Sequence, residues 1–249
     1  GMPFTAAHPS ILLPLLRVRW LSATGLIAGC ISPDFENYLF LEAGHESGHT
    51  LTGLFWFDLP MALLIALTFH LLVRDPLNDC LPDYLRSRLA ARWSFAFAAQ
   101  LKTRWPVFTI SALLGAASHI GWDSLTHNGW AAANLAFYHA WSVRVGDLDY
   151  PPFFVLQQIS SVLGTAFLLF YVLMLPSLPA KYAEDKTINR VWWFWPLMLT
   201  TASAIMGLRI DWNVPFNADR HLGDLVYAAV GACLAGLITA SALVRIRIH

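Results

Sequence analysis

The sequence is poor in charged residues. Only 13% of its 249 residues are charged and 57% are hydrophobic, whereas soluble domains carry about a quarter charged residues. Its mean hydropathy is +0.52. The 16 basic residues are balanced by 16 acidic ones, which argues against a positive surface for nucleic acid. We therefore expect an integral membrane protein that has membrane lipid as a partner and binds no nucleic acid.

Cysteine is equally scarce. The three cysteines, Cys30, Cys80 and Cys233, lie far apart in the sequence and form no CxxC pair. This spacing argues against a disulfide framework and against a thiolate zinc site. We interpret all three as buried small apolar residues.

Targeting signals, repeats and low-complexity tracts are also absent from the sequence. The first ten residues, "GMPFTAAHPS", lack the charged and continuous apolar regions of a signal peptide, so no cleaved leader is expected. No repeat of solenoid period is found. We expect a single helical membrane domain over residues 1–249, with its sequence motifs in residues 1–130.

Long apolar stretches predict the membrane crossings. A spanning helix needs about 20 mostly apolar residues. Five stretches approach that length: Leu51 to Val73, Val107 to about Thr126, Phe153 to Leu175, Val191 to Leu208 and Gly223 to Val244. The N-terminal region fits a helical hairpin with its tip near Arg17 to Arg19, in which Gly25 and Gly29 allow close helix approach. The prediction is an all-α, polytopic helical membrane protein with about five transmembrane helices and an N-terminal helical hairpin.

Basic residues fall mainly in alternate connections. Residues 74–106, residues 176–190 and the C-terminal tail are richer in Arg and Lys than residues 128–152 and 209–222. By the positive-inside rule, the basic connections face the cytoplasm. Residues 75–104 are then a cytoplasmic excursion, either an amphipathic helix at the lipid interface or a solvated loop.

Four polar clusters interrupt the apolar background. In "LLGAASHIGWDSLTHNGW", a four-residue spacing puts three ionisable side chains on one helix face. Ionisable groups inside a membrane are costly unless they are paired, hydrated or bound to metal. In the predicted topology all four clusters lie at the outward ends of helices, where they can meet. Their members are Thr5 and His8; Asp34 and Glu36; His45, Glu46 and His49; and His119, Asp123, Thr126 and His127.

Imidazole and carboxylate groups without thiolate suit a divalent transition metal. We predict Zn first, with Mn, Fe or Ni as alternatives, as one or two ions. Such a metal would make hydroxide available for hydrolysis near neutral pH. His127 is either a sixth ligand or a group that orients Asp123. The predicted ligands are His8, Asp34, His49, His119 and Asp123.

The remaining polar residues have more ordinary explanations. His70 is expected to be a hydrogen-bonded residue of a helix interior, and Asp34 could instead cap a helix. His45 is either a further ligand or an exposed loop residue. The roles of three others, in outer loops or in the site, stay open: His139, His221 and Asp224.

Four motifs resemble a known family. "MPFTAAHPS", "GCISPDFENYLF", "GHTLTGLFWFDLP" and "LLGAASHIGWDSLTHNGW" are similar to the bacterial multi-pass membrane family of unknown function called DUF4184. They are similar, more distantly, to membrane-bound metal-dependent hydrolases of the YdjM type. The hydrolase motifs correspond here to Thr5 and His8; Pro33, Asp34 and Glu36; His49; and His119, Asp123 and Thr126. This sequence departs from the hydrolase pattern by having Thr50 after His49 and "GHESG" before it.

The leading hypothesis is a membrane-embedded metal-dependent hydrolase. It would act on a phosphoester or other ester of a lipid or envelope molecule, at the extracytoplasmic side of the bacterial inner membrane. Glu36 or His127 would act as the general base, or would orient the metal ligands. Trp122, Trp130 and Trp141 would anchor the rim of the site at the interface.

Two other classes of protein remain open. In a transporter or ion-binding membrane protein, the same His and Asp groups would relay protons or metal, with His70, Gln157 or Gln158 continuing the path. In a structural membrane protein, the buried polar residues would only pair helices.

Overall fold

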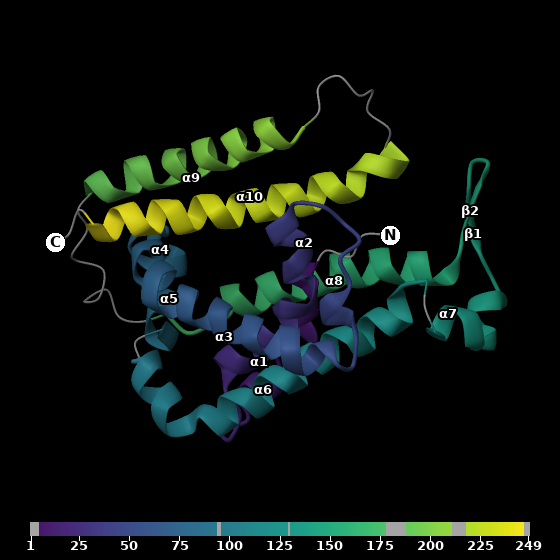
Figure 1. Ribbon diagram of the computed structural model, residues 1–249, viewed down its shortest axis with the longest axis horizontal. Coiled ribbons are helices and arrows are strands. Elements are labelled where there is room, and N and C mark those ends of the chain that lie inside the picture. Colours follow the sequence, from purple (N-terminus) through teal and green to yellow (C-terminus); the bar gives the residue numbers. More distant parts are fainter. Residues whose placement is uncertain (1–4, 94–95, 129, 178–187, 211–217, 247–249) are drawn as a thin grey trace. The chain divides into compact units, whose positions relative to one another are not determined.

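The computed structural model describes residues 5–93, 96–128, 130–177, 188–210 and 218–246, and they are mostly helical (Figure 1). The α-helices are α1 (Ala23–Ile31), α2 (Phe35–Phe40), α3 (Leu59–Thr68), α4 (Arg74–Cys80), α5 (Asp83–Trp93), α6 (Phe97–Thr126), α7 (Trp130–Asn134), α8 (Pro152–Leu173), α9 (Ile188–Arg209) and α10 (Ala218–Ile246). Short 3-10 helices are η1 (Thr5–Leu12), η2 (Leu15–Arg17), η3 (Ser32–Asp34), η4 (Ser47–His49) and η7 (Ala136–His139). Two π-helical turns, η5 (Leu54–Asp58) and η6 (Phe69–Val73), flank α3.

The prediction of a mainly helical protein is confirmed, with one β-hairpin as an exception among the described residues. Strands β1 (Val143–Val145) and β2 (Leu148–Tyr150) pair antiparallel, within residues expected to form an outer loop. Gly146 begins the turn with a φ of 61°, which glycine adopts without strain. The alternation of "VRVGDLDY" around Gly146 and Asp147 is a sequence signal for a hairpin that the prediction of an outer loop missed.

Three helical stretches are long and apolar enough to cross a membrane. They are Leu54–Cys80, which joins η5, α3, η6 and α4, then Pro152–Leu173 in α8, and Gly223–Ile246 in α10. The expected crossings at residues 107–126 and 191–208 are helical but are not among the three. Polar groups such as His119 and Asp123 lower the hydropathy of the first. The count of about five crossings stays a prediction.

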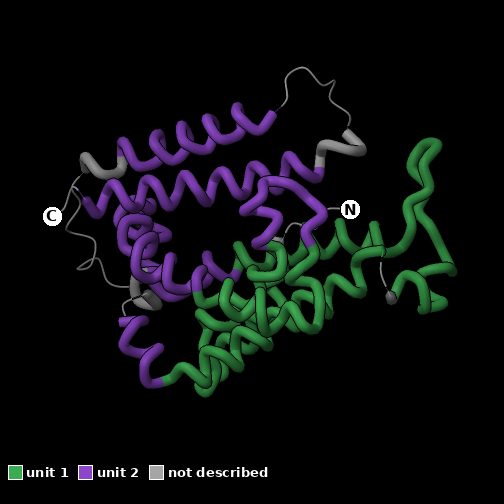
Figure 2. Tube along the Cα trace, viewed as in Figure 1, with its two compact units in different colours: residues 1–34, 46–63, 104–170 green, residues 35–45, 64–103, 171–249 purple. Residues whose placement is uncertain are grey.

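The described chain divides into two compact units, each built from three separate segments (Figure 2). Unit 1 comprises residues 1–34, 46–63 and 104–170, and unit 2 comprises residues 35–45, 64–103 and 171–249. One boundary falls in α6 at Arg104, where the backbone leaves helical geometry two residues before Pro106. The expectation of a single domain stays a prediction.

Close approach of α1 to α6 organises unit 1. A Cβ at Gly25 would lie only 2.8 Å from the Phe108 carbonyl oxygen, and one at Gly29 would overlap the Ala112 backbone. The close helix approach predicted for these glycines is confirmed, with α6 as the partner helix. The first arm of the predicted hairpin is instead the 3-10 helix η1, which contains Pro9 and packs on α1. Proline cannot continue an α-helical hydrogen-bond ladder.

Unit 2 is built around the packing of α9 on α10 (Figure 1). Its apolar core consists of Cys80, Phe194, Ala240 and Val244. Cys30 and Cys80 are buried as predicted, but Cys233 is exposed on α10, so the prediction of burial is wrong there. Most of the excursion at residues 75–104 is helical, in α4, α5 and the start of α6.

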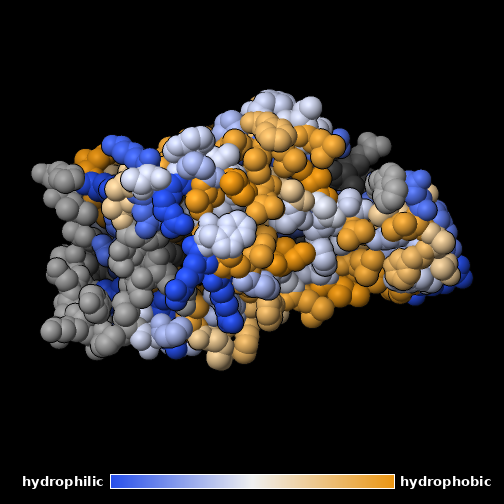
Figure 3. All heavy atoms as spheres, turned by 90° about the horizontal axis from the view of Figure 1, so that it is seen from below, coloured by the Kyte–Doolittle hydropathy of each residue, from blue (hydrophilic) through white to orange (hydrophobic). Residues whose placement is uncertain are grey.

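Large apolar side chains are exposed on the helices that could meet lipid. Val162 is 68% exposed on α8, and Trp105 is 61% exposed on α6. Figure 3 shows that apolar side chains cover much of one face of the molecule. Exposed apolar surface of this extent is typical of a surface that contacts lipid or another protein.

Candidate metal centre

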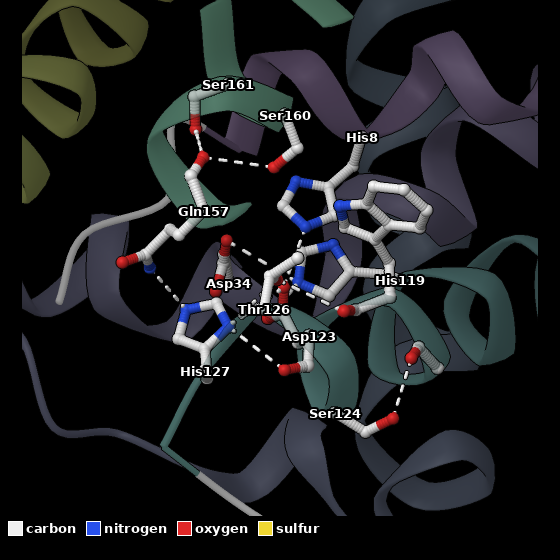
Figure 4. Close-up of polar contacts among 12 residues, drawn as sticks. His8, Asp34, His119, Asp123, Ser124, Thr126, His127, Gln157, Ser160 and Ser161 are labelled. Atoms are coloured by element: carbon white, nitrogen blue, oxygen red, sulfur yellow. Dashed lines mark hydrogen bonds and ion pairs between the residues drawn. The ribbon is translucent and has the colours of Figure 1, made fainter. Parts of the chain in front are cut away.

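Helix α6 supplies the first two groups of the site. His119 and Asp123 lie one turn apart, so their side chains project from the same face. His119 Nε2 is 3.1 Å from Asp123 Oδ2, and His119 is fully buried while Asp123 is 8% exposed. Figure 4 shows both residues among the other polar side chains of unit 1.

Two short 3-10 helices bring in the next two groups. Asp34 ends η3 and His49 ends η4. His49 Nε2 is 3.4 Å from both Asp34 Oδ1 and Asp123 Oδ2, and His119 Nε2 is 3.6 Å from Asp34 Oδ2. One ligand atom from each of the four residues lies within 4.8 Å of the others. This buried group can hold a metal ion.

The orientation of His119 suits a cation. Its Nδ1 lies 2.8 Å from the Cys30 carbonyl oxygen, and only a protonated nitrogen can donate there. In the neutral ring, Nε2 then carries a lone pair directed at the two carboxylates. Among the described residues Nε2 has no hydrogen-bond partner. A lone pair and two carboxylates that converge in a buried site are repulsive unless a proton or a metal ion lies between them.

His49 can balance this negative charge in the metal-free protein. Burial disfavours its charged form, but its contacts with Asp123 and Asp34 outweigh burial and raise the pKa of His49 to about 9. His49 is therefore protonated at neutral pH when no metal is bound. A metal ion at this position would replace that proton.

His8 lies beside the four ligands without belonging to their group. Its Nε2 is 2.8 Å from Asp123 Oδ1, and its ring stacks on His119 with 4.1 Å between centroids. His8 is 6% exposed. It therefore orients Asp123 and closes one side of the cluster, which is the arrangement typical of a residue that supports metal ligands.

His127 continues the polar network one turn further along the chain. Its Nδ1 is 3.2 Å from the Asp123 carbonyl oxygen and 3.4 Å from Asp123 Oδ1. Gln157 on α8 donates to its Nε2 over 2.9 Å. Figure 4 shows Gln157 beside His127, so Gln157 belongs to this site. Its long-range pairing left no signal in the sequence.

The structure does not bring the other candidates into the group. Glu36 lies on α2 in unit 2 and is not one of the grouped ligands. His45, also in unit 2, lies 3.4 Å from Glu42 and stacks on Phe40. His139 is exposed, and Asp224 accepts a hydrogen bond from the Ala43 amide in unit 2. The side chains of Thr5, Trp130 and His221 lie outside the described residues.

The comparison with sequence families agrees with these motifs. The family described as Domain of unknown function (DUF4184) matches residues 2–242. The chain belongs to the DUF4184 family. The match extends well past the first 130 residues, which carry the motifs. No curated protein and no solved structure matches this chain.

In this DUF4184 protein, Asp58 is a further buried acid that the sequence reasoning did not assign to the site. It ends the π-helical turn η5 and is 1% exposed. Among the described residues, none hydrogen-bonds to either of its carboxylate oxygens. A Cβ at Gly48, next to His49, would lie 2.8 Å from Asp58 Oδ1 and 2.6 Å from the Pro33 Cα. Asp58 therefore lies beside the backbone that carries Asp34 and His49.

Replacing Asp58 with asparagine is expected to stabilise the metal-free protein and to weaken metal binding. A buried carboxylate without donors costs free energy, so D58N is expected to raise the unfolding free energy of the metal-free protein by about 1–3 kcal/mol. The loss of negative charge near the ligands is expected to weaken metal binding by roughly tenfold. Thermal melts and metal titrations check both, with the exposed Asp149→Asn as the matched control. A lower melting temperature for metal-free D58N would contradict this account.

Proposed function

We propose that the protein is a membrane-embedded, metal-dependent hydrolase. The observation that carries the proposal is the buried group of two histidines and two aspartates in which His119 is locked by the Cys30 carbonyl. Nitrogen and carboxylate ligands in this number are typical of Zn, with Mn, Fe or Ni as alternatives. A divalent ion held there would supply Lewis-acid assistance for hydrolysis of an ester. The motif resemblance to YdjM-type hydrolases, which stays a prediction from the sequence, favours the same class.

The surrounding residues have distinct proposed roles. Asp34, His49, His119 and Asp123 hold the ion, and His8 holds Asp123 in place. His127 is the proposed general base, because its side chain is 28% exposed and its Nδ1 lies 3.4 Å from Asp123 Oδ1. Glu36, the other base considered from the sequence, lies on α2 in unit 2.

The proposed setting is a membrane. Three helices are long and apolar enough to cross one, and we infer two further crossings in α6 and α9. An ester or phosphoester of a lipid or envelope molecule is the proposed substrate, at the extracytoplasmic side of the bacterial inner membrane. Membrane lipid would then surround the protein and would also supply its substrate.

Turnover by the full chain tests the proposal. Detergent-purified protein loaded with Zn or Mn is expected to hydrolyse members of a panel of lipid esters and phosphoesters. D123N is expected to abolish turnover, and H127A is expected to lower kcat by roughly 100- to 10,000-fold with metal still bound. D149N, an exposed acid on the hairpin, is the control. Failure of the loaded protein to hydrolyse any ester would refute a hydrolase.

A chain of side-chain contacts runs from His8 to Asp123 Oδ1 over 2.8 Å and on to His127 Nδ1 over 3.4 Å, and it supports a second candidate function. Such a chain could relay protons in an ion-translocating protein. Reconstituted vesicles distinguish the two: a relay gives pH-dependent proton flux that H127A abolishes, whereas a hydrolase gives none.

A further inference from the structure

An apolar cavity of about 540 Å³ lies in unit 1 beside the metal centre. Its walls come from η1, α6, η7 and α8. They are formed mainly by apolar side chains, among them Ile11, Trp122, Leu125, Leu156 and Phe167. This volume falls in the range of small-molecule pockets, which is roughly 300–1,000 Å³.

The cavity ends at the metal centre. His8 and Thr126 line it, and the same His8 hydrogen-bonds to Asp123 and stacks on His119. A single side chain therefore separates the cavity from two of the four ligands. His8 Nδ1 is itself buried and has no hydrogen-bond partner among the described residues.

Four hydroxyl groups of the wall are already hydrogen-bonded to the backbone. Ser160 and Ser161 donate to the Gln157 carbonyl oxygen over 3.0 and 2.8 Å, and Figure 4 shows both contacts. Thr126 donates to the Trp122 carbonyl and Tyr138 to the Leu125 carbonyl. A mainly apolar wall in which four hydroxyls are already occupied favours an apolar ligand and gives little recognition of a sugar or a nucleotide.

One wall of the cavity is also a lipid-facing surface. Ile159, Leu163 and Phe167 line the cavity at one-turn spacing on α8. They are 48%, 62% and 55% exposed, and α8 is one of the three helices that can cross a membrane, with only 6% of its apolar segment buried. A hydrocarbon chain in the bilayer could therefore enter the cavity laterally, between the exposed side chains of α8.

We propose that this cavity holds the hydrocarbon chain of a lipid whose ester or phosphoester head group reaches the metal centre past His8. The inference rests on the proposed hydrolase function for the role of the head group. It names the substrate class: a long-chain lipid taken up laterally, with its apolar chain as the main contact with the protein.

Photo-crosslinking tests binding of the chain without requiring hydrolysis. The probe is hexadecyl phosphate with a diazirine in mid-chain, used on the full-length, metal-free protein in detergent, with labelled peptides mapped by mass spectrometry. Label is expected in η1 and in the part of α6 near Trp122. I159W and L163W, which enlarge side chains of the wall, are expected to reduce that label roughly tenfold. V162W, on the same helix but outside the lining, is the matched control and is expected to leave it unchanged.

Each outcome decides the proposal. Label confined to the outer faces of α8 and α10, and insensitive to I159W and L163W, would show only surface lipid and would overturn it. Equal labelling by a butyl phosphate probe would show recognition of the head group alone and would also overturn it. Chain-dependent label in the cavity, together with no hydrolysis by the metal-loaded protein, would support the chain site while refuting the hydrolase function.

Discussion

Replacing Asp123 with asparagine will remove bound metal from the protein. Asp123 is the group that the other residues share, because His8, His49, His119 and His127 all lie within 3.4 Å of one of its carboxylate oxygens. Loss of its charge removes one ligand and releases the others. The expected loss in affinity exceeds roughly 100-fold, since even residues behind a ligand contribute about 10- to 100-fold. Inductively coupled plasma mass spectrometry on detergent-purified protein without a His tag measures the metal.

Two further variants are compared with D123N for their metal content. H8A removes a contact of Asp123 but no member of the ligand group, so a smaller loss of roughly 10- to 100-fold is expected. D149N changes an exposed acid that pairs with Arg144 and should keep the metal content of the parent. The parent is expected to carry about one equivalent, because four ligands surround one point. A parent without metal after incubation with Zn or Mn would rule out the metal centre.

The affinity of the protein for metal is expected to depend on pH. The pKa of His49 is raised from 6.5 to about 9, so its proton stabilises the metal-free fold fully below pH 6.5 and that contribution is lost as pH rises towards 9. Metal must displace this proton, so its binding releases protons and tightens over the same interval. Affinity that stays constant between these pH values would mean that His49 is not a ligand.

The sequence predicted the centre of the site because part of its geometry is local. A four-residue spacing on a helix is enough to put His119 and Asp123 on one face, whatever the tertiary structure. The cost of ionisable groups in an apolar chain then indicated that Asp34 and His49 lie near them. The structure groups these four residues.

The other contacts depend on tertiary structure that no local pattern encodes. The packing of η1 against α6 decides whether His8 binds the metal ion directly or contacts Asp123 instead. Gln157 meets His127 across 30 residues of sequence, and Asp58 is placed by a π-helical turn, whose inserted residue shifts the register of the helix. A 3.6-residue period gives no sign of such a shift, so Asp58 looked like an interruption of a membrane helix.

Replacing Gly29 with leucine will prevent stable folding. At this position α1 lies so close to α6 that a Cβ would overlap the Ala112 backbone, and backbone atoms cannot move aside as a flexible side chain can. Gly115 of α6 packs similarly closely on the Leu26 carbonyl of α1. The two helices are therefore in close contact at more than one position, and a local shift at Gly29 would disturb the other contact as well. The expected loss in unfolding free energy is more than about 4 kcal/mol. Thermal melts and size-exclusion profiles in detergent measure it.

The matched control is Gly121→Ala, also on α6, where a Cβ would have no neighbour within 4 Å among the described residues. Alanine favours a helix by about 1 kcal/mol over glycine, so G121A should melt no lower than the parent. The smaller change Gly29→Ala should still destabilise the protein and weaken metal binding, because parting α1 from α6 breaks the bond from His119 to the Cys30 carbonyl. If G29A keeps both the melting temperature and the metal affinity of the parent, then close packing of these helices does not position the site.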